Sequence, residues 1–272
     1  MALAPAEASF VDVDGLRTSY TRKGSGPPLV LLHGQSPGSC WEVHWPATID
    51  HFATDYDVYA FDQVGFGRTA NRGDFSMAAR VAHAKAFLAA MGLSRCVLWG
   101  QSSGTEVALR IALEDSRVGA VIGQASGSLS PPDPDQGTTE ARRVTREMEE
   151  YTPTVENARA HLMAHIMDKR WVTHELVQRV VENSSGANFE AHQARFQAPR
   201  LPSLLPELGH IKVPVLLLWG RNDTVTPRRG LLLQAHIPSA ELHVFDNCGH
   251  WVQLDAFDRV NAVVRGFLAG LL

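Results

Sequence analysis

The sequence predicts an α/β fold in which a mostly parallel central sheet carries helices on both faces. Two observations lead to this prediction. Short apolar runs of strand length alternate along most of the chain with segments of helical periodicity, as successive βαβ units require. The chain of 272 residues is also long enough to bury a sizeable core and to carry an insertion.

The predicted strands and helices follow one another in a regular order. An opening hairpin is expected at residues 10–13 and 16–22. Buried strands are expected where short apolar runs occur, at residues 27–34, 57–62, 96–100, 118–123, 213–220 and 241–245. Helices are expected at residues 77–92, 103–114, 228–236 and 256–271. Right-handed crossovers then place these helices on the two faces of the sheet.

The alternation stops between residues 127 and 209, where a proline-rich segment opens a stretch of helix formers and charged residues. We interpret this stretch as an insertion. Residues 1–127 and 208–272 are predicted to form the core, and residues 128–207 a helical lid over the strand ends. Lid helices are expected at residues 140–150, 155–170 and 173–183.

The composition excludes several classes of protein. A formal net charge of -4 offers no basic surface to a phosphate backbone, so nucleic acid is not expected as a partner. No apolar run has the length of a membrane span, and the N-terminal segment does not read as a signal peptide. Cys40, Cys96 and Cys248 are expected to be free thiols in a reducing compartment. We therefore predict a cytoplasmic protein that acts on a small molecule.

The strongest functional signal is the segment GQSSG at residues 100–104, which fits the pattern G-x-S-x-G between a predicted strand and a predicted helix. In such a turn the serine hydroxyl stands clear of the backbone, and the helix N-terminus favours developing negative charge. Ser102 is the candidate nucleophile, and Ser103 is the weaker alternative because it occupies the variable position. On the motif alone, a helix N-cap serine is the competing interpretation.

A serine hydroxyl is a poor nucleophile unless a base removes its proton. His250 lies just beyond the last predicted strand, and Asp223 follows the preceding one. Singly, each could be an ordinary turn residue. Together, in the order Ser, Asp, His, the three residues predict a nucleophile, a base and an acid that orients the base.

Acyl transfer also needs donors for an oxyanion. The segment LHGQSPG at residues 32–38 follows a predicted strand and has glycines that allow close approach of backbone to substrate. The amide N–H groups of Gln35 and Ser103 are the predicted donors. His33 is expected to brace this loop, and a structural turn is the competing interpretation of the segment.

These motifs resemble the α/β-hydrolase superfamily over nearly the whole chain, and DQVGFGRT at residues 62–69 matches the turn after that family's fourth strand. Within the superfamily the chain is most similar to meta-cleavage-product hydrolases, which cut a carbon–carbon bond in dienol diketo acids from aromatic degradation. The matching segments are SPG at residues 36–38, followed by Trp41, and CGHWVQ at residues 248–253. The resemblance implies a homodimer or larger homo-oligomer.

The resemblance also implies residues that contact the substrate. Gly34, Ser36 and Trp251 occupy matching positions near the predicted nucleophile and base. In the family a lid arginine binds the substrate carboxylate in a bidentate manner, and Arg179 is the nearest match after a shift of one residue. The competing interpretation of Arg179 is a solvated arginine on a lid helix.

Three departures from the family weaken the carbon–carbon assignment. Val43 replaces the asparagine usually found two residues after the loop tryptophan, Gln101 precedes the nucleophile, and SGT at residues 103–105 replaces Met-Gly-Gly. Hydrolysis of a small ester or lactone needs only the triad and the oxyanion donors, so it is slightly favoured over carbon–carbon hydrolysis. A non-catalytic ligand receptor on the same fold is a third hypothesis. Peroxidase activity without a cofactor is a conceivable side reaction.

Neither a metal nor another cofactor is expected. His161 and His165 share one helical face, but Leu162 stands where the metalloprotease pattern has glutamate, and no third ligand is evident. Trp171 and Phe196 in the lid could line an apolar pocket, although such aromatics more often pack against the core.

Overall fold

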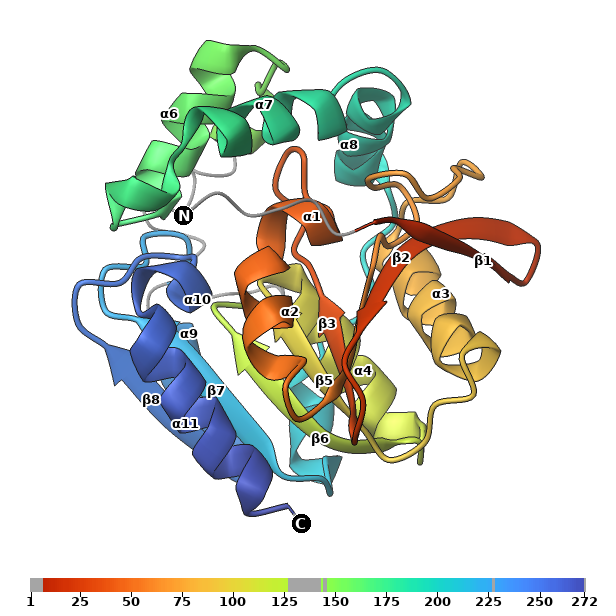
Figure 1. Cartoon of the computed structure of the whole chain (residues 1–272), viewed down its shortest axis with the longest axis vertical. Coiled ribbons are helices and arrows are strands. Elements are labelled where there is room, and N and C mark those ends of the chain that lie inside the picture. The colour runs from red at the N-terminus through yellow and green to blue at the C-terminus, as the bar shows by residue number, and fades with distance from the viewer. Residues whose placement is uncertain (1–6, 127–142, 144–145, 227, 272) are drawn as a thin grey trace.

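The computed structural model describes residues 7–126, 143, 146–226 and 228–271 (Figure 1). An eight-stranded sheet with the order β1-β2-β4-β3-β5-β6-β7-β8 forms its centre. The strands are β1 (Ser9–Val13), β2 (Leu16–Lys23), β3 (Pro28–Leu32), β4 (Asp57–Phe61), β5 (Cys96–Gln101), β6 (Val118–Gln124), β7 (Val215–Gly220) and β8 (Ala240–Phe245). Every strand predicted from the sequence is present, and the predicted α/β-hydrolase architecture is confirmed.

Only β2 runs against the other strands described. The hairpin of β1 and β2 turns at Asp14 and Gly15, whose φ angles of 51° and 74° suit a tight two-residue turn. β2 then pairs antiparallel with β4, and all pairs from β4 to β8 are parallel. The carboxyl ends of the parallel strands therefore meet at one edge, where ligands bind in open α/β sheets.

Two apolar layers cover the two faces of the sheet, because successive side chains of a strand point to opposite faces. Val30 and Leu32 of β3 face α3 (Met77–Ala90), α4 (Ser103–Glu114) and α9 (Arg229–His236). Leu29 and Leu31 face α2 (Pro46–Phe52) and α11 (Phe257–Ala269). The predicted helices of the core are present within a few residues, whereas α1 (Trp41–His44), α2 and α10 (Val252–Asp255) were not predicted.

Three helices of the predicted lid lie together above the carboxyl ends of the strands (Figure 1). They are α6 (Val155–His165), α7 (His174–Asn183) and α8 (Ala187–Gln197). The predicted helix 155–170 ends early, because Ile166 is extended and a short 3-10 helix, η1 (Lys169–Trp171), follows. The helix expected at 140–150 falls partly outside the described residues, and its described residues 143 and 146–149 are helical. Helix α8 was not predicted.

Apolar contacts connect α6 and α7 to the core. Val43 of α1 and Trp251 pack with Leu162, Val177 and other buried lid residues in a third apolar cluster. The predicted boundary at residue 127 lies outside the described residues, and the boundary at 208 falls within η2 (Leu205–His210), so the division into core and lid stays a prediction. No helix of the described residues is long and apolar enough to cross a bilayer.

Candidate active site

Ser102 occupies a sharp turn between β5 and α4, with φ of 54° and ψ of -126°. A positive φ is costly for a residue with a side chain, so the surrounding packing must enforce it. Both flanking glycines are required by space: a Cβ on Gly100 would lie 2.3 Å from the carbonyl oxygen of Gly104, and a Cβ on Gly104 would lie 2.3 Å from that of Leu32. The Ser102 amide donates a hydrogen bond of 2.7 Å to the carbonyl of Gln124 in β6. The G-x-S-x-G pattern thus has the strand-turn-helix context that an exposed nucleophile needs.

His250 and Asp223 are in direct contact at the ends of β8 and β7. Nδ1 of His250 lies 3.2 Å from Oδ1 and 3.1 Å from Oδ2 of Asp223, and both residues are buried. Asp223 also accepts hydrogen bonds from the Val225 and Thr226 amides and from the Thr226 hydroxyl. These contacts hold the imidazole ring in one orientation.

Burial by itself raises the pKa of the Asp223 carboxyl. The charge of His250 and the hydrogen bonds from His250, Thr226 and Val225 outweigh burial, so the pKa lies below its ordinary value of 3.8. Asp223 is therefore an anion at neutral pH and can stabilise a protonated His250. Among the described residues no hydrogen bond joins the Ser102 hydroxyl to His250, a contact that often tightens only when substrate binds.

The predicted oxyanion loop lies directly against Ser102, the predicted nucleophile. A Cβ on Gly34 would come within 3.0 Å of the Cβ of Ser102 and 2.6 Å of Oε1 of Gln101. His33 braces the loop, because its Nδ1 bonds to the Gly34 carbonyl at 2.8 Å and its Nε2 accepts the Gln63 amide at 3.1 Å. This fixes the neutral tautomer of His33 with the proton on Nδ1.

Within the described residues, no hydrogen bond uses the amide N–H of Gln35 or that of Ser103. Gln35 follows Gly34 in the loop, and Ser103 follows the nucleophile at the N-terminus of α4. Two amides without a hydrogen bond in the described part of the chain therefore lie close to Ser102 along the chain or beside it in the loop, and such donors could stabilise an oxyanion there. Ser36, the next loop residue, is buried, and its carbonyl accepts the Ser39 amide at 3.0 Å.

Arg80 is a buried cation behind these donors that sequence patterns did not reveal. Its guanidinium donates to Oγ of Ser103 at 2.9 Å, to Oε1 of Gln35 at 3.4 Å, to Oε1 of Gln63 at 2.9 and 3.0 Å, and to the His33 carbonyl at 3.4 Å. Burial lowers the pKa of Arg80 to about 10, so it remains charged. The signal that could have revealed Arg80 in the sequence is that a charged residue stands at a core-facing position of the helix predicted at residues 77–92.

Trp251, beside the base, is buried and stacks on His44 with ring centroids 4.3 Å apart. Several buried polar atoms here lack a hydrogen-bond partner within the described residues: Nε1 of Trp251, Nδ1 of His44 and Oε1 of Gln101. Unpaired buried polar atoms are uncommon in folded proteins, and these three lie on or beside residues next to the predicted nucleophile and base, where a substrate could bond to them.

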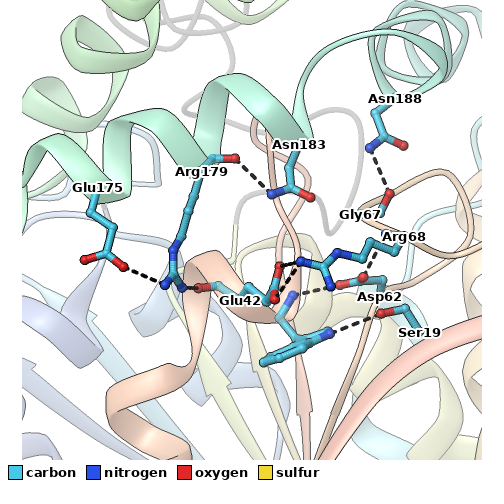
Figure 2. Close-up of polar contacts among 10 residues, drawn as sticks. Ser19, Glu42, Asp62, Gly67, Arg68, Glu175, Arg179, Asn183 and Asn188 are labelled. Carbon is cyan, nitrogen blue, oxygen red and sulfur yellow. Dashed lines mark hydrogen bonds and ion pairs between the residues drawn. The ribbon is translucent and has the colours of Figure 1, made fainter. Parts of the chain in front are cut away.

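Arg179 projects from α7 toward α1, as Figure 2 shows. Its Nη2 lies 2.7 Å from Oε1 of Glu175, and its Nη1 donates to the Glu42 carbonyl at 3.4 Å. It lines a hollow with about 480 Å³ of open space between α1 and α7, together with Trp171 and Leu254. None of the three triad residues lines this hollow, and substrate binding by Arg179 stays a prediction.

No group of three potential metal ligands occurs among the described residues. The rings of His161 and His165 lie 4.2 Å apart, and Nδ1 of His165 bonds to the His161 carbonyl at 2.7 Å. Burial lowers the pKa of His165 to about 4. Phe196, the other lid aromatic considered, packs against the ring of His192 at 5.2 Å.

The match to known proteins covers nearly the whole chain. A family model described as the alpha/beta hydrolase fold matches residues 27–257. The chain belongs to the α/β-hydrolase family. A "2-hydroxy-6-oxononadienedioate/2-hydroxy-6-oxononatrienedioate hydrolase" of Burkholderia vietnamiensis strain G4 is 34% identical to this α/β-hydrolase, over 97% of this chain and 96% of that protein.

Two further proteins are also similar over nearly the full length of this chain. A "2-hydroxy-6-oxo-6-phenylhexa-2,4-dienoate hydrolase" of Burkholderia cepacia is 31% identical, over 94% of this chain and 93% of that protein. The solved structure of a meta-cleavage product hydrolase from Pseudomonas fluorescens IP01 matches with a TM-score of 0.87 at 29% identity, over 97% of this chain and 98% of that chain. The predicted resemblance to meta-cleavage-product hydrolases is thereby confirmed, and this α/β-hydrolase is an enzyme.

Proposed function

We propose that this α/β-hydrolase cleaves a carbon–carbon bond in a 2-hydroxy-6-oxo-dienoate. The observation that carries the proposal is full-length similarity, at 31–34% identity, to enzymes named for substrates of this class. The departures from the family pattern had slightly favoured an ester or lactone. The relatives favour carbon–carbon hydrolysis over ester or lactone hydrolysis, because similarity of this extent covers both the core and the predicted lid.

The structure offers an explanation for one of those departures. Val43 is buried in the apolar cluster that joins α1 to Leu162 and Val177 of the lid. A polar side chain at this position would lose an apolar contact with the lid. The adjacent His44 is also buried, and its Nδ1 has no hydrogen-bond partner in the described part of the chain, so the region beside the predicted base keeps a polar side chain despite Val43.

The proposed reaction begins with ketonisation of the substrate, in which the proton of the 2-hydroxyl group is lost and a proton is added at carbon 5. Ser102 then attacks the carbonyl carbon 6 while His250 accepts its proton, and Asp223 stabilises the imidazolium. The amides of Gln35 and Ser103 stabilise the oxyanion. The bond between carbons 5 and 6 breaks, and carbon 5 leaves as part of a dienolate that takes up a proton. Water releases the acid from Ser102.

Direct turnover tests this proposal. Purified protein is mixed with 2-hydroxy-6-oxo-6-phenylhexa-2,4-dienoate, and loss of the dienolate colour gives kcat/KM. We expect about 10⁴ M⁻¹s⁻¹ or more for the wild type, within the usual range for enzymes. Ser102→Ala should be inactive, and Ser94→Ala, at an exposed serine outside the site, should match the wild type.

A nitrophenyl ester measured in parallel separates the two hydrolase functions. Turnover of the ester alone, lost in Ser102→Ala, would replace carbon–carbon hydrolysis with ester hydrolysis. Equal activity of wild type and Ser102→Ala on both substrates would contradict the assignment of Ser102 as the nucleophile of a triad.

A further inference from the structure

Helix α6 ends against the loop that carries His250, the predicted base. The carbonyl of His165, the last residue of α6, accepts the backbone N–H of His250 at 3.0 Å. The two segments approach so closely that a Cβ on Gly249 would lie 2.6 Å from that carbonyl oxygen. The rings of His165 and His250 lie 5.9 Å apart. The end of a helix of the predicted lid is therefore in direct contact with the predicted base.

Asp255 makes a second connection between the same two segments. It ends α10, which lies below α6 in the view of Figure 1. Its Oδ2 accepts the Gly249 amide at 2.7 Å and the Met167 amide at 3.0 Å, and its Oδ1 accepts the Asp168 amide at 2.8 Å. Hydrogen bonds to a carboxylate are stronger than those between neutral groups. One side chain thus holds the residue before His250 and two residues just beyond the end of α6.

The same contacts account for the early end of α6. In a helix continued to residue 170, the N–H groups of Met167 and Asp168 would bond to carbonyls four residues earlier. Ile166 is instead extended, with φ of -109° and ψ of 121°, and both N–H groups donate to Asp255. Asp255 therefore replaces the helical acceptors that this break removes, and it stabilises the backbone in the position where it meets the base loop.

Apolar packing closes the contact on one side. Ile166, Trp251 and Leu254 are buried in the third apolar cluster, which joins α6 and α7 to the core. Trp251 follows His250 in the chain, and Leu254 precedes Asp255. Hydrogen bonds beside such a cluster are electrostatically stronger than in water, so the end of α6 and the base loop are expected to move together.

Asp223 holds the imidazole ring of His250, whereas His165 and Asp255 hold the backbone that carries the ring. We propose that Asp255 is a positioning residue, which ties the end of α6 to the base loop so that His250 is aligned for proton transfer only while α6 is docked. A base must stand within hydrogen-bond reach of the proton that it takes, so a shift of the loop lowers the rate. The inference applies to an ester as well as to the dienoate, but it rests on the proposed role of His250 as the base.

Variants at Asp255 remove the contact in graded steps. Asp255→Ala removes all three acceptor contacts. Asp255→Asn has one oxygen, which can keep Gly249 and Met167 but then turns its NH₂ group toward the Asp168 N–H. Asp258→Asn is the matched control, because Asp258 is an exposed aspartate in the first turn of α11. Steady-state kcat and KM are measured with 4-nitrophenyl butyrate and with the dienoate, per folded protein.

A change on the side of the predicted lid tests whether the coupling passes through α6. Met167→Pro deletes one N–H donor and does not touch the bond between Gly249 and Asp255. The extended backbone of Ile166 is the conformation that a residue before proline requires. Met167→Ala is the control, because it keeps the N–H group and changes only an exposed side chain.

Asp255→Ala and Met167→Pro should lower kcat about 10- to 100-fold, the loss expected from a small misplacement of a catalytic group. KM should change less than about threefold, because the base acts in the transition state. Asp255→Asn should lie between Asp255→Ala and the wild type, and Asp258→Asn and Met167→Ala should match the wild type. Hydrogen–deuterium exchange in Asp255→Ala should be faster at residues 166–169 and 248–251 and unchanged in β3 and β5.

A kcat within threefold of the wild type in Asp255→Ala or in Met167→Pro would overturn the proposal, and so would a change confined to KM. Faster exchange throughout the core would also overturn it, because the loss would then come from stability. His250→Ala separates these results from the proposed function: wild-type activity in that variant removes the base assignment. If only the ester is turned over and Asp255→Ala still lowers kcat, the positioning role stands and carbon–carbon hydrolysis fails.

Discussion

Arg80 links the two chain segments whose amides are proposed to stabilise the oxyanion. It bonds to the Ser103 hydroxyl at 2.9 Å and to the Gln35 side chain at 3.4 Å. Replacing Arg80 with methionine removes both links and keeps most of the apolar volume of the side chain. The oxyanion loop is still held elsewhere, because Nε2 of Gln63 donates to the His33 carbonyl at 2.7 Å. We therefore expect partial rather than complete loss of the oxyanion site.

The expected magnitude follows from that partial loss. Removing one oxyanion donor typically lowers kcat about 10²- to 10³-fold, and Arg80→Met should lie at the lower end, near 10²-fold or about 2.7 kcal/mol. KM should change less than about threefold, since the oxyanion forms only during the reaction. Arg117→Met is the matched control, because Arg117 pairs with Asp115 at the amino end of β6, away from the site.

The assay is steady-state turnover of whichever substrate the wild type accepts, with the concentration of folded protein verified by circular dichroism. A kcat within threefold of the wild type would refute the reasoning about Arg80. An increase confined to KM would also refute it, because that result would assign Arg80 to substrate binding instead of oxyanion stabilisation.

Two other predictions follow from buried polar contacts. Asp223→Asn should lower kcat about 10⁴-fold, because an amide cannot hold the His250 tautomer or stabilise its protonated form, and near-wild-type turnover would contradict the triad. His83 must be neutral in the fold, since its Nδ1 accepts the Val64 amide at 3.1 Å and its Nε2 lies 2.8 Å from the Thr18 hydroxyl. Burial lowers the pKa of His83 from 6.5 to about 4, so the unfolded state takes up a proton first, and about 3 kcal/mol of stability, present above pH 6.5, should be lost as pH falls toward 4. Urea unfolding at pH 7.5 and 4.5 should show a smaller loss in His83→Gln, and an equal loss would exclude His83 as the cause.

The elements that could be predicted from the sequence are those whose formation depends on residues close by in the chain. The strands at residues 28–32 and 96–101 are short apolar runs, and their alternating burial on two faces follows from strand geometry alone. Ser102 was predicted as the nucleophile for a similarly local reason, because Gly100 and Gly104 are the residues that allow its turn. The short helices α1 and α2 lacked such signals, since α1 has only 4 residues and α2 only 7, too few for a helical period to show. The longer helix α8 was also not predicted.

The sequence by itself determined the order of the strands and of the longer core helices and the turn at Ser102, because these depend on neighbours a few residues away. It also predicted that His250 and Asp223, 27 residues apart, would meet, because they follow consecutive strands. The surroundings of Arg80 and Arg195 depended on the tertiary structure. Arg80 meets Ser103 and Gln35 across separations of 23 and 45 residues, and Arg195 meets Gly65 across 130. An arginine in a helix is ordinarily a surface residue, and only the packing of distant segments decides that its charge is buried beside a catalytic site.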